Sequence, residues 1–297
     1  MEIDTLARKV ITKNEIFADV VNYFLFDGKA EIKSDDLKEL DTAFKDKVKD
    51  IDKQRFRDIY KEVVIKTDSK NTYLLVGIEN QSKVDNRMLL RCLEYNIMSY
   101  YKQLDDIENK NKNVKIKLKP VITFVLYFGT KKWTGPKSLY EMLDLEFEEI
   151  KGFITNPKLY LISPNEIDEN NINKFNSELR TILKYIKYSK RKTELREVIS
   201  KDDKFNEMSN DSVKLLSAVT KTKIKTNEEK GVVNMCKAID DMMKDAKNEG
   251  RNETLVENAI NLYKNGASLE LISKSLGMSI NKLKKILTQN NVELRTC

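Results

Sequence analysis

Three polar residues close an apolar, β-prone run and together could hold a metal ion. The run YLLVGI, residues 73–78, ends in Glu79, Asn80 and Gln81. An earlier strand-like run, residues 57–66, carries Asp58 near its start. Carboxylate, carbonyl and amide oxygens are the ligands that hard cations such as Mg²⁺ prefer. Such a site requires a fold that brings Asp58 beside Glu79.

A tight β-hairpin would bring these side chains together. The segment 67–70 between the two runs has the composition of a turn. With this loop, Asp58 faces Glu79 across an antiparallel pair, on one face of the sheet and with Cβ atoms about 5 Å apart. Gln81 follows Glu79 by two residues and therefore shares that face. The hairpin predicts two carboxylates and an amide at one end of the sheet.

Two facing carboxylates in a half-buried sheet repel each other, so one must take up a proton or a cation must lie between them. Asp58, Glu79 and the backbone carbonyl of Asn80 would suit Mg²⁺ or Mn²⁺, with water completing the coordination. A structural alternative stays open, in which Asp58 pairs with Arg55 or Arg57 and Glu79 pairs with a lysine. A register slip of one residue would also turn Asp58 to the opposite face.

The composition excludes several other kinds of chemistry. Histidine is absent from the 297 residues, which excludes Ser-His-Asp and Cys-His catalysis and histidine-bound zinc. The three cysteines are scattered, so no disulfide framework is expected. No apolar run reaches signal-peptide or transmembrane length, which predicts a cytoplasmic protein without a membrane partner. The net charge of +7 favours a polyanionic partner.

The elements around the hairpin predict an α/β fold, a mixed sheet flanked by helices with an α-helical C-terminal region. Amphipathic helices are expected over residues 14–26 and 86–104. Strands are expected over 119–129 and 159–163, and the first of these is apolar on both faces, as in a sheet covered on both sides.

Three regions are expected along the chain: an α/β domain at 1–168, a basic helical region at 169–250 and a helix-turn-helix-like segment at 251–297. One long helix is expected over 172–199. Its stretch KYIKYSKRK interleaves tyrosines with cations, as surfaces that track phosphates do, although a solvated helix face has the same composition. The candidate DNA-binding cations here are Lys187, Lys190, Arg191 and Lys192.

The segment 266–287 has the sequence pattern of a helix-turn-helix. Ser268 and Ser279 are expected to cap two helices, and Gly277 fits the turn between them. A recognition helix contacts DNA from the second position of such a motif, where this chain carries cations. A plain helical hairpin would show the same pattern. The candidate DNA-binding cations here are Lys282, Lys284 and Lys285.

Four segments, in order, resemble the recombination-promoting nuclease/putative transposase (Rpn) family of the PD-(D/E)xK nuclease superfamily. The segments, within about residues 14–165, are FADVVNYFLFDG, RFRDIY, GIENQSKVDNRMLLRCLEYNIMSYYKQ and PVITFVLYFGTKKW. The resemblance implies a restriction-endonuclease-like core and Mg²⁺-dependent cleavage of DNA. It puts the family's Asp on Asp58 and its Glu on Glu79.

Gln81 stands where the superfamily pattern usually has lysine. An amide can orient a water molecule by hydrogen bonding but carries no charge. A nearby cation would have to replace the lysine, and Lys83, Arg87 and Arg91 are the candidates.

The resemblance also implies a further acidic group on the first helix, for which Glu15 and Asp19 are candidates. An acid near a helix N-terminus can equally serve the helix dipole. Arg91 and Tyr95 lie one turn apart on the helix after Gln81, where they would face the metal site or form a solvated polar face.

The resulting prediction is a Mg²⁺- or Mn²⁺-dependent DNA endonuclease of a transposase- or recombination-associated family, acting as a homo-oligomer, most simply a dimer. Two alternatives remain. One is a catalytically degenerate DNA-binding accessory protein. The other is a helical oligomerisation module built on an apolar stripe: Val232, Met235, Ile239, Met242 and Met243.

Overall fold

The computed structural model describes residues 3–46, 53–66, 71–110 and 115–294. The chain divides into two compact units, Met1–Cys236 and Lys237–Cys297. The expected α/β domain and most of the expected basic helical region therefore share the first unit.

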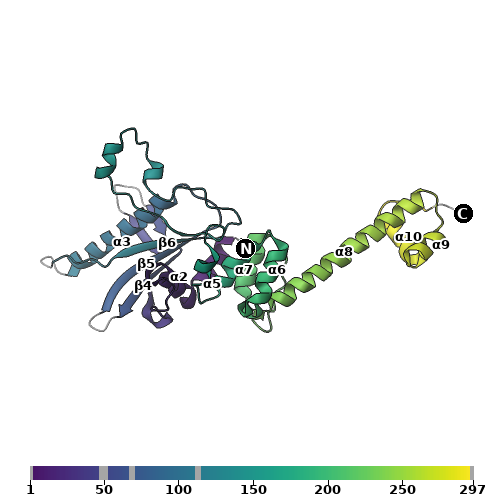
Figure 1. The fold of residues 1–297 in the computed structure, drawn as a ribbon, viewed down its shortest axis with the longest axis horizontal. Coiled ribbons are helices and arrows are strands. Elements are labelled where there is room, and N and C mark those ends of the chain that lie inside the picture. Colours follow the sequence, from purple (N-terminus) through teal and green to yellow (C-terminus); the bar gives the residue numbers. More distant parts are fainter. Residues whose placement is uncertain (1–2, 47–52, 67–70, 111–114, 295–297) are drawn as a thin grey trace. The chain divides into compact units, whose positions relative to one another are not determined.

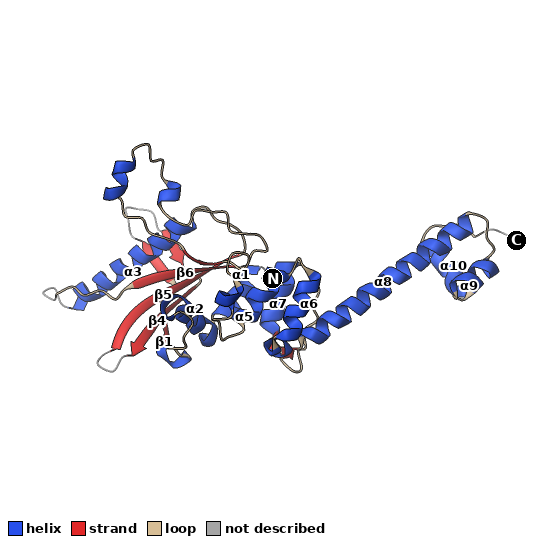
Figure 2. Cartoon of the chain, viewed as in Figure 1, coloured by secondary structure: helices blue, strands red, loops and turns tan. Residues whose placement is uncertain are grey.

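A five-stranded mixed sheet organises the first unit (Figures 1 and 2). Strand β4 runs antiparallel to β1 and β5, whereas β6 and β7 run parallel to β5. The sheet and its flanking helices confirm the expected mixed α/β fold. In sheet order the strands are β1 (Leu37–Glu39), β4 (Ile59–Lys66), β5 (Asn71–Gln81), β6 (Val121–Tyr127) and β7 (Tyr160–Ile162).

Within the described ranges, helices and two small two-stranded sheets make up the remaining regular structure. The small sheets pair β2 (Ala43–Asp46) with β3 (Lys53–Phe56) and β8 (Met208–Ser209) with β9 (Val232–Val233). The α-helices are α1 (Ile3–Ile11), α2 (Asn14–Phe26), α3 (Met88–Lys110), α4 (Glu169–Ile172), α5 (Leu179–Tyr188), α6 (Lys192–Lys201), α7 (Asn210–Thr220), α8 (Met235–Lys264), α9 (Leu269–Leu276) and α10 (Ile280–Gln289).

Helices cover both faces of the sheet, as the apolar character of β6 predicts. Helix α2 packs on one face, where the ring of Phe24 stacks on Phe124 with centroids 4.3 Å apart. Helix α3 covers the other face, where Leu89 and Cys92 share a buried cluster with Val125. Neighbouring residues of a strand point to opposite faces, so Phe124 and Val125 mark the two sides of the sheet.

The β4–β5 hairpin has the predicted register. Lys66 pairs with Asn71 and Ile59 pairs with Ile78. The predicted turn at residues 67–70 lies outside the described residues. The register is the feature that positions the two candidate acids.

The prediction of a single helix over 172–199 is wrong, because the chain forms two helices, α5 and α6, with a break between them. At the break, Arg191 leaves the helical region with φ −121° and ψ 82°. Its guanidinium lies 4.5 Å from the ring centroid of Tyr188 and pairs with Glu194 at 2.6 Å. The two short helices contact each other, and Ile186 of α5 and Ile199 of α6 are both buried. On one continuous helix these residues would lie about 140° apart.

The second unit has a core of its own around α9 and α10. The helices are joined by the three residues 277–279, and Gly277 adopts the left-handed conformation with φ 62°. Ser268 and Ser279 accept hydrogen bonds from the backbone N–H groups of Leu271 and Lys282, which confirms the expected caps. The buried cluster comprises Ala259, Tyr263, Ile272, Leu283 and Leu287.

None of the helices in the described part of the chain combines the length and apolar character that a bilayer-spanning helix needs.

Candidate active site at the end of strand β5

Asp58 and Glu79 meet where the β4–β5 hairpin ends. Ile59 pairs with Ile78, so the next residue pair outward is Asp58 with Glu79. The Asp58 carboxylate accepts a hydrogen bond from the backbone N–H of Asn80 at 2.8 Å. The backbone N–H of Asp58 lies 3.4 Å from Oε1 of Glu79. The two acids are therefore linked through the backbone ends of both strands.

Glu79 is a completely buried acid with weak partners. Its side chain is 0% exposed, and its two hydrogen-bond contacts, the N–H of Asp58 and Nη2 of Arg91, are both 3.4 Å long. Burial, followed by the charge of Asp58, raises the pKa of Glu79 to about 8. Burial also raises the pKa of Asp58. A pair of this kind holds a proton at neutral pH unless a cation joins it.

Helix α3 brings Arg91 to the acid pair. Arg91 contacts Glu79 through Nη2 and holds Asp85 through Nη1 at 3.1 Å. Tyr95, one turn further along α3, is buried beside it. Of the three cations considered as replacements for the superfamily lysine, Arg91 contacts Glu79, whereas Lys83 and Arg87 are exposed. Arg91 thus brings to Glu79 a positive charge that the neutral side chain of Gln81 cannot supply.

A second cation, Arg57, lies buried under the same end of the sheet. Its guanidinium donates to Oδ1 of Asn96 at 3.0 Å and lies over the rings of Tyr60 and Tyr95 at 4.6 and 5.3 Å from their centroids. Burial lowers the pKa of Arg57, and the charges of nearby groups, Glu79 among them, oppose that shift. Sequence reasoning considered Arg57 only as a salt-bridge partner of Asp58 and missed this role.

The signal that could have revealed Arg57 is Gly77, a glycine inside an apolar strand. Such a glycine often marks a close approach by another group. Here a Cβ atom on Gly77 would lie 2.0 Å from Nη1 of Arg57. The glycine leaves the space that the buried guanidinium occupies.

The donor set suits a hard divalent cation. Within the described residues no group of three or more Asp, Glu, Cys or His side chains could hold a metal, so the protein ligands reduce to Asp58, Glu79 and nearby backbone or amide oxygens. Mg²⁺ accepts such a sparse set because it keeps several waters. The side-chain amide of Asn80 is also buried without a hydrogen-bond partner in the described structure. The end of β5 therefore carries more buried polar groups than its protein partners satisfy.

The two accessory acids on α2 lie in different surroundings. Asp19 is buried, and its carboxylate accepts hydrogen bonds from the backbone N–H groups of Asn176 and Ser177 and from the Ser177 hydroxyl. Glu15 is exposed in the first turn of α2. Asp19 thus fixes the segment before α5, and neither acid makes a described contact with Asp58 or Glu79.

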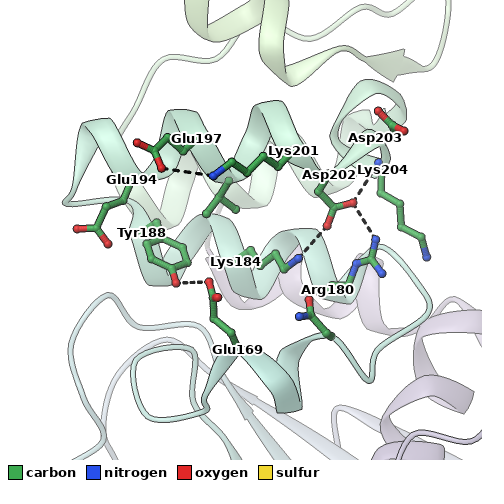
Figure 3. A pocket seen from close by; sticks show the side chains of 12 residues that line it. Glu169, Arg180, Lys184, Tyr188, Glu194, Glu197, Lys201, Asp202, Asp203 and Lys204 are labelled. Atoms are coloured by element: carbon green, nitrogen blue, oxygen red, sulfur yellow. Dashed lines mark hydrogen bonds and ion pairs between the residues drawn. The ribbon is translucent and has the colours of Figure 1, made fainter.

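The basic stretch of α5 borders a polar groove of about 660 Å³ between α4, α5 and α6 (Figure 3). Asp202 accepts from Arg180 at 2.8 Å and from Lys184 at 2.9 Å. The groove is lined by five acidic side chains and four basic ones, so it does not form a continuous phosphate track. The charged lining residues are Glu169, Glu194, Glu197, Asp202 and Asp203, with Arg180, Lys184, Lys201 and Lys204.

The candidate DNA-binding cations fall into two groups. Lys187 donates to the carbonyl of Ile167 at 2.5 Å, and Arg191 pairs with Glu194, so both are used within the fold. Lys190 and Lys192 are exposed. In the second unit Lys282, Lys284 and Lys285 are all exposed on α10.

A family model described as "Transposase_31: Putative transposase, YhgA-like" matches residues 3–215, which include the sheet, both acids and the helices from α1 to the first half of α7. No curated protein and no solved structure gave a match.

Proposed function

The chain belongs to the family of YhgA-like putative transposases, and from this premise we propose that it is a metal-dependent endonuclease that hydrolyses DNA phosphodiester bonds. The observation that carries the proposal is Glu79, a completely buried carboxylate with only 3.4 Å contacts, opposite the second acid Asp58. Folding a protein around such a pair is costly unless a cation joins it in the working state.

Asp58, Glu79 and the backbone carbonyl of Asn80 would hold Mg²⁺ or Mn²⁺, which supplies a water of lowered pKa and neutralises charge that builds on the phosphate. Gln81 shares the face of Glu79 and can orient the attacking water through its amide. Hydrolysis adds the oxygen of that water to phosphorus and breaks one P–O bond, and the leaving oxygen takes a proton. Arg57 and Arg91 contribute positive charge that the neutral Gln81 lacks.

The DNA backbone can approach the acids over the segments that follow β5 and β6. These strands are parallel, so the segments after their carboxyl ends lie at the same edge of the sheet. The N–H of Phe128 donates to the carbonyl of Gln81, which ties the two strand ends together. The segments carry three exposed lysines, Lys83, Lys131 and Lys132. We expect these cations to contact phosphates on either side of the bond that is cut.

The experiment that tests this function is a plasmid-nicking assay with purified full-length protein, in EDTA, Mg²⁺ or Mn²⁺. We expect nicking with either metal, and linear product if two copies cut opposite strands. Asp58→Asn keeps an oxygen that can accept the Asn80 N–H bond, so the fold should survive while metal binding is weakened. We expect this variant to lose nicking by about 100-fold, the upper end of the loss caused by disturbing groups around a metal.

Glu62→Gln is the matched control, because Glu62 also lies on β4 but its carboxylate pairs with Lys119. We expect it to nick normally. An Asp58→Asn protein that keeps full activity would refute the assigned site. Wild-type protein that binds DNA but never cuts it with any metal would favour the DNA-binding accessory protein instead.

A further inference from the structure

The α9–α10 hairpin has the turn length and the caps of a helix-turn-helix and lies beyond the residues that the family model matches. Its turn has three residues with a left-handed Gly277, and serine side chains cap both helices. A turn of three or four residues that often contains glycine is typical of DNA-binding motifs of this type. The C-terminal end of α8 completes the core through Ala259 and Tyr263. The hairpin is therefore a packed, capped element rather than a frayed end.

One face of α10 is fixed by this core. Leu283 and Leu287 are completely buried. At about 100° per residue, Asn281 and Lys285 lie roughly 160° from Leu283 around the helix, and Thr288 continues their line. All three residues of this line are exposed. The outward face of α10 is therefore a polar line of Asn281, Lys285 and Thr288.

Two further lysines flank that line. Lys282 and Lys284 lie about 100° from Leu283 on opposite sides of the helix, and both are exposed. Among the described residues no ion pair involves either of them or Lys285, and α10 contains no acidic residue. The helix thus offers three uncompensated positive charges around a hydrogen-bonding line, which is the complement of a groove bordered by two phosphate backbones.

We propose that the α9–α10 hairpin is a double-stranded DNA reader in which α10 enters the major groove. Asn281 and Lys285 contact base edges, because asparagine recognises adenine through two hydrogen bonds and lysine recognises the acceptors of guanine. Lys282 and Lys284 contact the phosphates on the two sides of the groove. The second unit then gives the nuclease a preferred site, which the groups at the acid pair do not encode. This inference deepens the proposed function and rests on it for its biological use, but the DNA-binding site stands independently.

The test uses full-length Asp58→Asn protein in EDTA, so that DNA is bound and not cut. The probe is a pool of duplexes with a randomised central segment, from which bound molecules are selected and sequenced. We expect an enriched sequence for the parent protein and a changed or lost preference for Asn281→Ala and Lys285→Gln. Each of these two substitutions should reduce the discrimination between the preferred base pair and the others at one position by about 5- to 150-fold.

The flanking lysines predict a different result. Lys282→Gln and Lys284→Gln should weaken binding of all duplexes alike and reduce the slope of log affinity against log salt by about 0.9 each. Lys247→Gln is the matched control, because Lys247 is exposed on α8 in the same unit but outside the hairpin. It should change neither preference nor slope, and circular dichroism should show unaltered melting for all five proteins.

Two results would overturn the proposal: variants of α10 that select the same sequence with the same salt slope as the parent, or variants that alter the mass seen by light scattering and leave DNA binding unchanged. The second result would mean that this face of α10 contacts a second copy of the chain rather than DNA. The nuclease proposal and the DNA-reader proposal can fail separately. Protein that selects a sequence but never nicks plasmid would contradict the nuclease proposal and support the DNA reader. Protein that nicks plasmid, with no effect of the α10 variants on DNA binding, would support the nuclease and contradict the DNA reader.

Discussion

The guanidinium of Arg57 lies in the space that a side chain on Gly77 would need: Nη1 is 2.0 Å from the ideal Cβ position. The residues come from neighbouring strand regions, and both lie beside the acid pair, because Gly77 precedes Glu79 by two positions on the same face. The buried cation and the buried acid are thus parts of one arrangement. Disturbing the glycine should disturb the charge balance of the site.

Gly77→Ala should therefore destabilise the protein by about 3 kcal/mol, through overpacking against a side chain that cannot leave without exposing or stranding its charge. Chemical denaturation followed by circular dichroism measures the change. Gly250→Ala is the control, since its Cβ meets nothing within 4 Å and it lies inside α8. That change should stabilise α8 by about 0.5–1 kcal/mol. A Gly77→Ala protein as stable as wild type would mean that Arg57 can move aside.

The raised pKa of Glu79 predicts a stability that falls with pH in the absence of metal. Below about pH 4.5 this carboxyl is protonated in both the folded and unfolded states, so its ionisation has no effect. Between that value and the folded pKa of about 8 the unfolded state loses the proton first, so the free energy of unfolding falls. Above pH 8 the penalty is complete.

Glu79→Gln should abolish the pH-dependent penalty of ionising Glu79. In EDTA the melting temperature of the variant should therefore exceed that of wild type, by a difference that grows from pH 5 to pH 9. Mg²⁺ should raise the melting temperature of wild type at pH 8.5 and leave the variant unchanged, because metal binding draws on the ionised carboxylate. Parallel melting of the two proteins across this pH range would show that Glu79 already ionises normally.

Asp19→Asn should lower stability by about 2–3 kcal/mol without altering the metal response. The carboxylate of Asp19 accepts hydrogen bonds from the backbone N–H groups of Asn176 and Ser177 and from the Ser177 hydroxyl. The NH₂ group of an asparagine would face these donors and leave some of them without an acceptor. The melting temperature in EDTA and its shift on adding Mg²⁺ are measured together. Exposed Glu15→Gln should change neither. Loss of the Mg²⁺ shift with an unchanged melting temperature would instead assign Asp19 to the metal site.

The hairpin register could be predicted because it depends on local information. A turn composition fixed the loop, and the alternation of side chains then fixed which residue faces Glu79. The caps Ser268 and Ser279 were predictable for the same reason, since each acts within three residues.

The features that sequence reasoning missed depend on packing between distant segments. Arg57 is held by Asn96 of α3, and no local pattern brings these residues together. Between α5 and α6, by contrast, the sequence did carry a sign of the break: residues 189–194 are all polar, and on one continuous helix Leu195 would lie about 180° from Ile186. At the break Arg191 stacks on Tyr188, and α6 turns back into contact with α5.

Salt dependence of DNA binding can distinguish which lysines meet the backbone near the acids. In the Asp58→Asn protein with EDTA, replacing Lys131 and Lys132 by Gln should lower the slope of log affinity against log salt by about 2, because two phosphate contacts are lost. The matched pair Lys190→Gln and Lys192→Gln removes the same charge from the connection between α5 and α6 and from the first residue of α6. A smaller change is expected there, because acids outnumber bases in the adjoining groove. A larger effect of the second pair would move the DNA path to that connection, as the basic stretch KYIKYSKRK first indicated.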